Sequence, residues 1–420
     1  MTESQLAVFR NRQFTALWSA FGISFLGDAA VRVGYPLLTL AVTGSPVAAG
    51  WVAFAANLPS LVLALPAGWA ADTWNRRYIL VTCQLVGTVV AAIVLAAVLT
   101  GSGVLPALIG GAFAEGTVAT TAGAARLPSL RSVVPAGQRS AALSAYEVLT
   151  LATGLAGRAL GGLLFGLARW LPFGANLASY LGSAALLGTI PADALTSRAV
   201  PQKPAPRHGT RESFRWLRQE SFLRFCVLSL SGTGMVFQIL QLVLIVTVRH
   251  SGDTWQVGLV LAASGAGGAV GAMIAPATPR SWSASAIIAT SLYVWAALLA
   301  GMTSTTDAYL LALLNLGIGG VGGFSNVAIN VYLLEAVPEE KLGRINAAAE
   351  ILPNTTLVAS AAAAGYLVAA RGPTNTLYLL ALAMITLAVC GTFYRRFERG
   401  EGSLGRGPKE LSCKEIERKE

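Results

Sequence analysis

Charged residues are scarce in this sequence. Asp, Glu, Lys and Arg make up only 12% of the 420 residues, about half the share in a soluble domain, while 54% are hydrophobic. So few charges cannot cover the surface of a water-soluble globule of this length. The apolar residues do not alternate with polar ones in segments of about ten, which excludes a membrane β-barrel. The sequence therefore predicts an all-α membrane protein, since helices satisfy their own backbone hydrogen bonds in lipid.

Histidine and cysteine are also rare, with two and four copies. The cysteines lack metal-ligand spacing, and neither His208 nor His250 belongs to a Ser-His-Asp set. Gly265-Ala-Gly-Gly268 lies within an apolar run and lacks the Lys-Ser/Thr of a phosphate-binding loop. We therefore expect no enzymatic activity, no metal and no cofactor. Any transport would be driven by an ion gradient rather than by ATP hydrolysis.

Apolar runs of about 20 residues, the length that crosses a bilayer, recur along the chain. We count twelve, six on each side of a polar stretch, with short connections elsewhere. The predicted spans are Phe14–Val42, Pro46–Ala71, Tyr78–Leu99, Val104–Leu127, Ser140–Leu167, Trp170–Ile190, Phe222–Val248, Trp255–Ala275, Ser283–Met302, Asp307–Leu334, Ile345–Ala370 and Thr374–Tyr394.

The polar stretch divides the chain into two six-helix halves, residues 1–190 and 222–396. Residues 191–221 form the linker, and within it Arg211–Glu220 predicts an amphipathic helix on the membrane surface. Residues 397–420 are charged and rich in glycine, so we expect a disordered tail.

Motifs repeated between the halves indicate duplication of a six-helix unit. Val134-Pro135 precedes Glu147 at the same spacing as Val337-Pro338 precedes Glu350. Gly44 and Gly50 are likewise repeated as Gly252 and Gly258. The halves are therefore expected to be pseudo-repeats.

Lysine and arginine fall almost entirely on one side of the predicted membrane. The opposite side holds only Arg169, Arg249 and Arg371. The positive-inside rule then predicts that both termini are cytoplasmic, and we expect a multi-pass protein of the bacterial inner membrane. This topology accounts for the net charge of +10 without a nucleic-acid partner.

The loop between the second and third spans carries the most specific motif. Gly68, Asp72, Arg76 and Arg77 match Gly-x-x-x-Asp-x-x-Gly-Arg-Arg of the major facilitator superfamily, with Asn75 in place of the second glycine. Asn tolerates a left-handed backbone, so we expect the turn to be kept. The chain thus resembles this superfamily over residues 10–396, and within it the drug and natural-product exporters of the macrolide-efflux and siderophore-exporter type.

The resemblance implies the twelve-helix major facilitator fold, with a substrate site between the halves. It also implies that Asp72 and the arginines latch the cytoplasmic side, facing the N-terminus of the eleventh span, when the cavity opens outward. The alternative is that the arginines have no role in a latch and only keep this loop on the cytoplasmic side of the membrane. The matching loop of the second half, at Pro276–Arg280, lacks the motif.

Two positions depart from the superfamily pattern. The antiporter motif Gly-Pro-x-x-Gly-Gly reads Gly157-Arg158-Ala-Leu-Gly161-Gly162, which keeps the small residues for helix packing but adds a charge. In the fourth span, Ala112 stands at the arginine position of many proton-coupled exporters. A coupling scheme that uses that arginine cannot be carried over.

Charges inside spans are costly and indicate use or pairing. Asp28 and Arg32 are four residues apart on one helix face. Either they form an internal ion pair, or Asp28 takes up and releases a proton while Arg32 adjusts its pKa. Glu115 lacks a partner at helical spacing. It either binds a proton or a cation, or is a hydrogen-bonded polar residue packed between helices. Arg158 has three possible roles: its side chain extends to the membrane surface, it binds an anionic substrate, or it pairs with a carboxylate on another span. We favour the pairing.

The remaining candidates are gates and cavity ligands. Glu147 and Glu350 are expected to act as gating or capping residues near the cytoplasmic ends of their spans. The second half offers amides in place of charges, and these are expected to line the substrate cavity: Gln238, Gln241, Asn315, Asn326 and Asn330.

Together these features predict a monomeric secondary transporter that exports a small amphipathic drug, antibiotic or other natural product by proton antiport. A siderophore, sugar or lysolipid is the alternative cargo, moved outward or inward. A non-transporting membrane sensor or scaffold is the alternative class.

Overall fold

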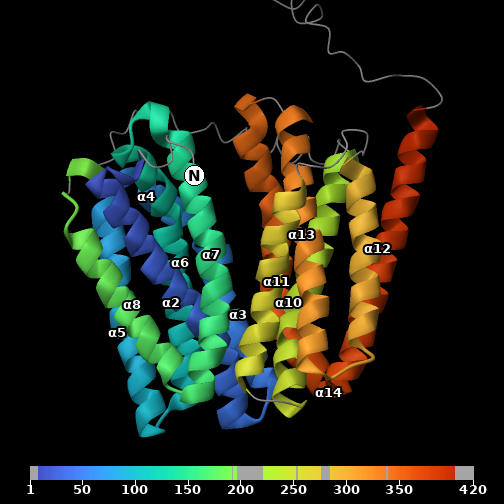
Figure 1. The fold of residues 1–420 in the computed structure, drawn as a ribbon, viewed down its shortest axis with the longest axis horizontal. Helices are drawn as coiled ribbons and strands as arrows, with labels where there is room; N and C mark the ends of the chain where they lie inside the picture. The colour runs from blue at the N-terminus through green and yellow to red at the C-terminus, as the bar shows by residue number, and fades with distance from the viewer. Residues whose placement is uncertain are drawn as a thin grey trace, which may run out of the picture.

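The structure, a computed structural model, describes residues 8–191, 193–195, 221–251, 254–275, 284–336 and 339–402. In these ranges it is almost entirely helical and has no strand. Figure 1 shows two bundles of long, roughly parallel helices standing side by side. The linker helix predicted at Arg211–Glu220 lies outside the described residues. The predicted tail begins differently from the expectation, because residues 397–402 continue helix α14, and the rest of it lies outside the described residues.

The N-terminal bundle comprises the helices up to residue 188. These are α2 (Arg12–Thr43), α3 (Pro46–Val62), α4 (Ala64–Thr73), α5 (Arg76–Thr100), α6 (Val104–Val133), α7 (Arg139–Leu167) and α8 (Leu171–Gly188), with short 3-10 turns at Ala136–Gln138 and Asp193–Leu195.

The C-terminal bundle follows the linker. Its helices are α10 (Ser221–Ser251), α11 (Thr254–Ile274), α12 (Ala284–Met302), α13 (Ala308–Ala336) and α14 (Glu339–Gly402). The last is two helices joined at Gly372, whose backbone is left-handed (φ 76°).

The twelve predicted spans are all helical in the described residues, counting α3 with α4 once and α14 twice. By length and apolar character, eight of these helices can cross a membrane, or nine with the α3–α4 pair. One of the eight, Leu352–Phe393, has 42 residues, enough for two crossings.

The second span is broken rather than continuous. Helices α3 and α4 meet at 51°, with Leu63 between them. Pro66 has no backbone N–H and cannot donate to the Val62 carbonyl, which explains why the helix breaks there.

The fourth span is longer than predicted. Helix α6 continues to Val133 instead of ending at Leu127, so Arg131 is helical as well as Arg126. The side-chain amide of Asn11, which caps α2, donates to the Val133 carbonyl at 2.8 Å and ties the two helices at this end.

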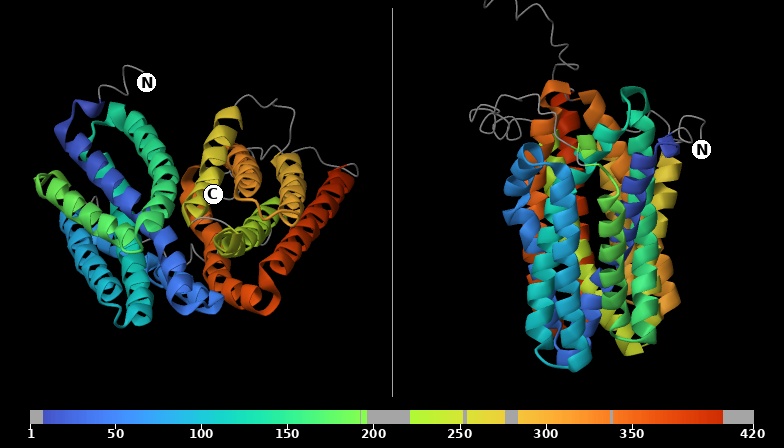
Figure 2. Two further views of the ribbon diagram at one scale, coloured as in Figure 1. Left: turned by 60° about the horizontal axis from the view of Figure 1, so that its bottom comes forward. Right: turned by 90° about the vertical axis from the view of Figure 1, so that its left-hand side faces the viewer.

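The two bundles meet at the end opposite the N-terminus, here called the far end (Figure 1). Helix α3 packs along α14, and α7 packs along α11. Both contacts are made between glycines: Gly162 lies on Gly258, and Gly50 lies on Gly365. Figure 2 shows the bundles from two further sides, and in its left view they form the arms of a V.

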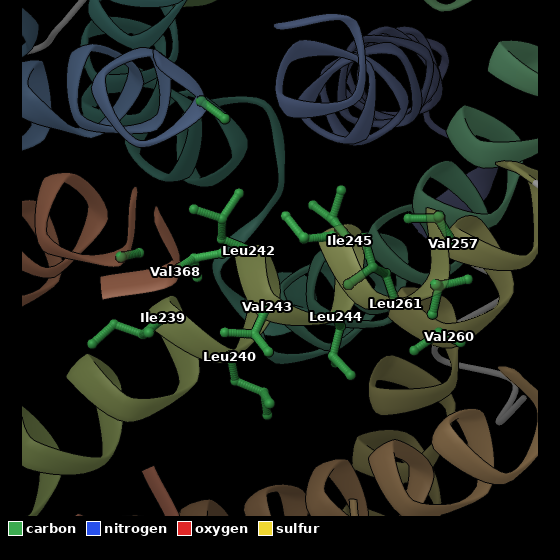
Figure 3. Close-up of a cluster of buried hydrophobic side chains, with 14 of the residues drawn as sticks. Ile239, Leu240, Leu242, Val243, Leu244, Ile245, Val257, Val260, Leu261 and Val368 are labelled. Carbon is green, nitrogen blue, oxygen red and sulfur yellow. The ribbon is translucent and has the colours of Figure 1, made fainter. Parts of the chain in front are cut away.

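Apolar packing continues across this joint. One buried cluster includes Val52 and Phe173 of the N-terminal bundle together with Val243 and Leu292 of the C-terminal bundle. Figure 3 shows part of this cluster, where side chains of α10 and α11 pack together, with Val368 of α14 beside them.

Candidate functional site

A cavity of about 480 Å³ lies between the bundles. Seven helices line it: α2, α3 and α7 from one bundle, and α10, α11, α13 and α14 from the other. Much of the wall is apolar, with Val52, Phe237, Ile245 and Leu261 among its residues. A small compound with an apolar body fits such a space.

The polar part of the wall is unequal between the bundles. Arg32, Arg158 and Asn57 come from the N-terminal bundle, whereas Gln238, Gln241 and Asn315 come from the C-terminal bundle, so both charges lie on one side. The structure therefore brings two predicted charges and three predicted amides to one cavity. Neither arginine has a carboxylate at ion-pair distance among the described residues, so the pairing expected for Arg158 is not observed.

The predicted amides differ in their freedom to bind a ligand. Asn315 is buried and donates to the Val260 carbonyl at 2.7 Å, so its amide nitrogen is engaged within its own bundle. Gln241 is exposed in the cavity. Asn326 lies on α13 outside the cavity lining, and the side chain of Asn330 is outside the described residues.

Asp28 does not pair with Arg32, contrary to the first of the two readings from the sequence. Its carboxylate accepts a hydrogen bond from the Tyr180 hydroxyl at 2.8 Å and lies 3.9 Å from the Arg126 guanidinium. Residues four apart can meet on one helix face, but here packing of α2 against α6 and α8 supplies better-placed partners. Arg126 also lies over the Phe25 ring, 4.3 Å from its centroid.

Glu115 is buried, with 8% of its surface exposed. The Asn176 side chain donates to its carboxylate at 3.1 Å, and the Tyr35 hydroxyl lies close to the same carboxylate. Since Tyr35 also lines the cavity, it stands between Glu115 and the place where a substrate would bind.

These contacts define a buried polar cluster of Asp28, Glu115, Arg126, Asn176 and Tyr180. Three members were not predicted as site residues. Arg126 stands at the end of the predicted span Val104–Leu127, where an arginine is expected to face the cytoplasm, but only 6% of it is exposed. Asn176 gave a usable signal, being an amide in the middle of an apolar run. Tyr180 gave none, because tyrosine is common in such runs.

Close helix packing positions this cluster. A side chain at Gly27 of α2 would collide with Ser179 and Asn176 of α8. A Cβ at Gly87 of α5 would lie 2.9 Å from the Tyr180 ring. Glycine at these two positions therefore lets α8 bring its polar side chains up to the carboxylates.

The motif loop, Gly68–Arg77, lies at the near end, where the N-terminus is. Asp72 is exposed, while Arg76 donates to the Ala71 carbonyl at 3.2 Å and Arg77 to the Gly188 carbonyl at 2.9 Å. Each arginine thus binds a carbonyl in the last turn of a helix, where a cation is favoured.

The backbone of Asn75 differs from the expectation. It is extended (φ −65°, ψ 118°) rather than left-handed, and its side chain caps α5 by accepting from the Arg77 backbone N–H at 2.9 Å. Asparagine is a strong N-cap residue, which explains how it replaces glycine in this turn.

The other motif glycines lie in close contacts of α7. Gly157 and Gly161 pack on Ala29 and Ala30 of α2. Arg158, between them, turns to the cavity. Glu147 on the same helix is exposed, and the side chain of Glu350 is outside the described residues.

The comparison with known proteins agrees with this architecture. The sequence matches the Major Facilitator Superfamily profile over residues 17–355, more than half of the chain. The chain belongs to the major facilitator superfamily. Membership makes it a multi-pass membrane protein and a transporter rather than an enzyme. No curated protein sequence matches it.

Solved structures with the superfamily fold cover nearly the whole chain. The nucleoside transporter NupG aligns at a TM-score of 0.70 and 12% identity, covering 91% of this chain and 98% of that chain. A bacterial homologue of the iron transporter ferroportin, in an inward-facing state, aligns at 0.68 and 17%, covering 91% and 98%. A bacterial homologue of the human lysosomal transporter Spinster, inward-facing and unoccupied, aligns at 0.67 and 13%, covering 94% and 98%. At these identities the likeness shows the fold alone.

Proposed function

We propose that this protein is a secondary active transporter that exports a small amphipathic compound across the cell membrane by alternating access, coupled to protons by antiport. The observation that carries the proposal is the position of Glu115, buried in the N-terminal bundle and separated from the central cavity by Tyr35. A carboxyl group so placed can exchange a proton with the space that holds the substrate.

The arrangement of the bundles supports alternating access. The far end is sealed by the glycine contacts of α7 with α11 and α3 with α14, and by a hydrogen bond of 3.2 Å from Trp51 to the Tyr366 hydroxyl. At the near end α4 packs against helices of its own bundle. With the N-terminus cytoplasmic, as the positive-inside rule predicts, this is an inward-facing state.

The motif loop is then a latch in its released position. Asp72 is exposed, and a side chain at Gly68 would meet nothing within 4 Å. Neither residue type is required by contacts in this state. Both are explained if the loop approaches the start of α14 when the near end closes, where the helix dipole attracts the carboxylate.

Proton coupling can be tested with the purified protein in liposomes that contain a pH-sensitive dye. A panel of macrolides, siderophores, sugars and lysolipids is added, one compound at a time, under an imposed pH gradient of either direction. We expect at least one amphipathic compound to trigger proton movement in the wild type. If no compound triggers proton movement under either gradient, the proposed proton-coupled export is contradicted.

A further inference from the structure

Two guanidinium groups share the cavity wall. Arg32 of α2 and Arg158 of α7 both line it, and they are close enough to repel one another. Arg32 is exposed within the cavity, and Arg158 is partly buried. Like charges held together at membrane depth are costly, which calls for a compensating group.

The described residues offer no such group inside the cavity. No Asp or Glu is among the lining residues that the structure describes. Glu115 attracts Arg32 from behind the wall but forms no ion pair with it. Asp28 is engaged by Arg126 and Tyr180. The contrast with Arg126, which has a carboxylate and an aromatic ring, shows that this bundle can satisfy an arginine where the cavity does not.

We propose that the cavity binds an anionic group between Arg32 and Arg158, so that the cargo is an amphipathic organic anion carrying a carboxylate, sulfonate or phosphate. Guanidinium groups present planar, paired N–H donors that match these oxygens. The amides of Gln238 and Gln241 lie on the opposite bundle and can donate to the same group or to its neighbour. Phe237, Ile245 and Leu261 contact the apolar body.

This inference rests on the proposed function only in treating the bound molecule as cargo. The anion site itself depends on the two arginines, so binding can be measured without transport.

The test uses three probes that share one apolar body: naphthalene-2-sulfonate, naphthalene-2-methanol and naphthalene-2-methylammonium. Their binding is measured by equilibrium dialysis to the full-length protein in phosphatidylcholine nanodiscs. We expect the sulfonate to bind at least about tenfold more tightly than the other two. We expect Arg32→Gln and Arg158→Gln each to reduce sulfonate binding by about tenfold or more and to leave the alcohol unchanged.

Two further variants make the result specific. Arg32→Lys keeps the charge and should retain much of the sulfonate binding. Arg169→Gln, an exposed position outside the cavity, removes one positive charge of the chain and should bind like the wild type. Equal or absent binding of all three probes, preference for the ammonium probe, or unchanged sulfonate binding in both cavity variants would overturn the inference.

The same assay identifies the source of the anion. If phosphatidylglycerol added to the nanodiscs displaces the sulfonate from the wild type, the occupant is an anionic lipid. If it does not, the occupant is a soluble anion. Sulfonate binding without transport would leave the anion site in place and contradict the proposed function. Transport of cations alone would leave the proposed function in place and contradict the anion site.

Discussion

The two bundles share one fold but use different chemistry to hold it together. In the described residues, the N-terminal bundle buries Glu115 and Arg126 and keeps Asp28 largely enclosed beside them. The buried polar residues described in the C-terminal bundle are all neutral, namely Ser, Thr and Asn. Glycines meet backbone carbonyls in both bundles, as Gly161 meets Ala30 in the first and Gly267 meets Leu316 in the second, so the buried charges make the difference.

This difference indicates a division of labour. Charges are costly in a membrane and can change state when a proton binds, so the N-terminal bundle has the means to couple transport to an ion. The described buried polar residues of the C-terminal bundle are neutral and its helices pack closely through glycines, so this bundle can move as a rigid partner.

The largest effect on stability is expected from breaking the buried ion pair. Asp28→Asn leaves the Arg126 charge uncompensated, which should cost about 3–5 kcal/mol and lower the melting temperature in detergent. The double variant Asp28→Asn, Arg126→Gln removes the orphaned charge and should be more stable than the single variant. If the double variant melts no higher, Asp28 does not compensate Arg126.

The C-terminal bundle should be sensitive to size rather than to charge. Gly267→Ala places a methyl group against the Leu316 carbonyl and should destabilise the protein by about 1–3 kcal/mol. Gly268→Ala is the matched control, since a Cβ added at Gly268 would lie 3.6 Å from the Gly319 carbonyl oxygen, at ordinary van der Waals distance. Equal melting temperatures for the two variants would show that α11 and α13 are not tightly packed.

The motif loop should affect rate more than stability. Asp72 is exposed in this state, so Asp72→Ala should fold with an unchanged melting temperature. It should slow transport several-fold, because the state closed at the near end would lose the interaction of the Asp72 carboxylate with the start of α14. Spectroscopic distances between labels on α4 and α13 would report the populations of the two states. Wild-type turnover with wild-type populations would rule out a latch.

The sequence predicted the helices well because each is a long apolar run between polar breaks. It missed the bend after Val62 because Pro66 lies inside a run that is apolar throughout. It did not indicate the role of Arg126, because an arginine near the end of a span has the same sequence context whether it faces water or Asp28.

The partners of the buried charges could not be predicted for a related reason. Spacing along one helix favoured Asp28 with Arg32, but the observed partners come from α6 and α8, at separations only the packed bundle defines. The cavity was easier to predict: of the amides expected there, Gln238, Gln241 and Asn315 line it. Those residues lie on α10 and α13, two of the helices that line the cavity between the bundles.

The most direct test compares one substitution in each bundle by a single assay. Once a transported compound is known, its accumulation in liposomes is measured with a pH gradient, and its exchange is measured without one. Glu115→Gln should abolish gradient-driven accumulation and preserve exchange. Gln241→Ala should weaken apparent affinity and preserve coupling. The assignment of coupling to the N-terminal bundle would be contradicted if Glu115→Gln kept full gradient-driven accumulation. It would also be contradicted if only Gln241→Ala lost gradient-driven accumulation.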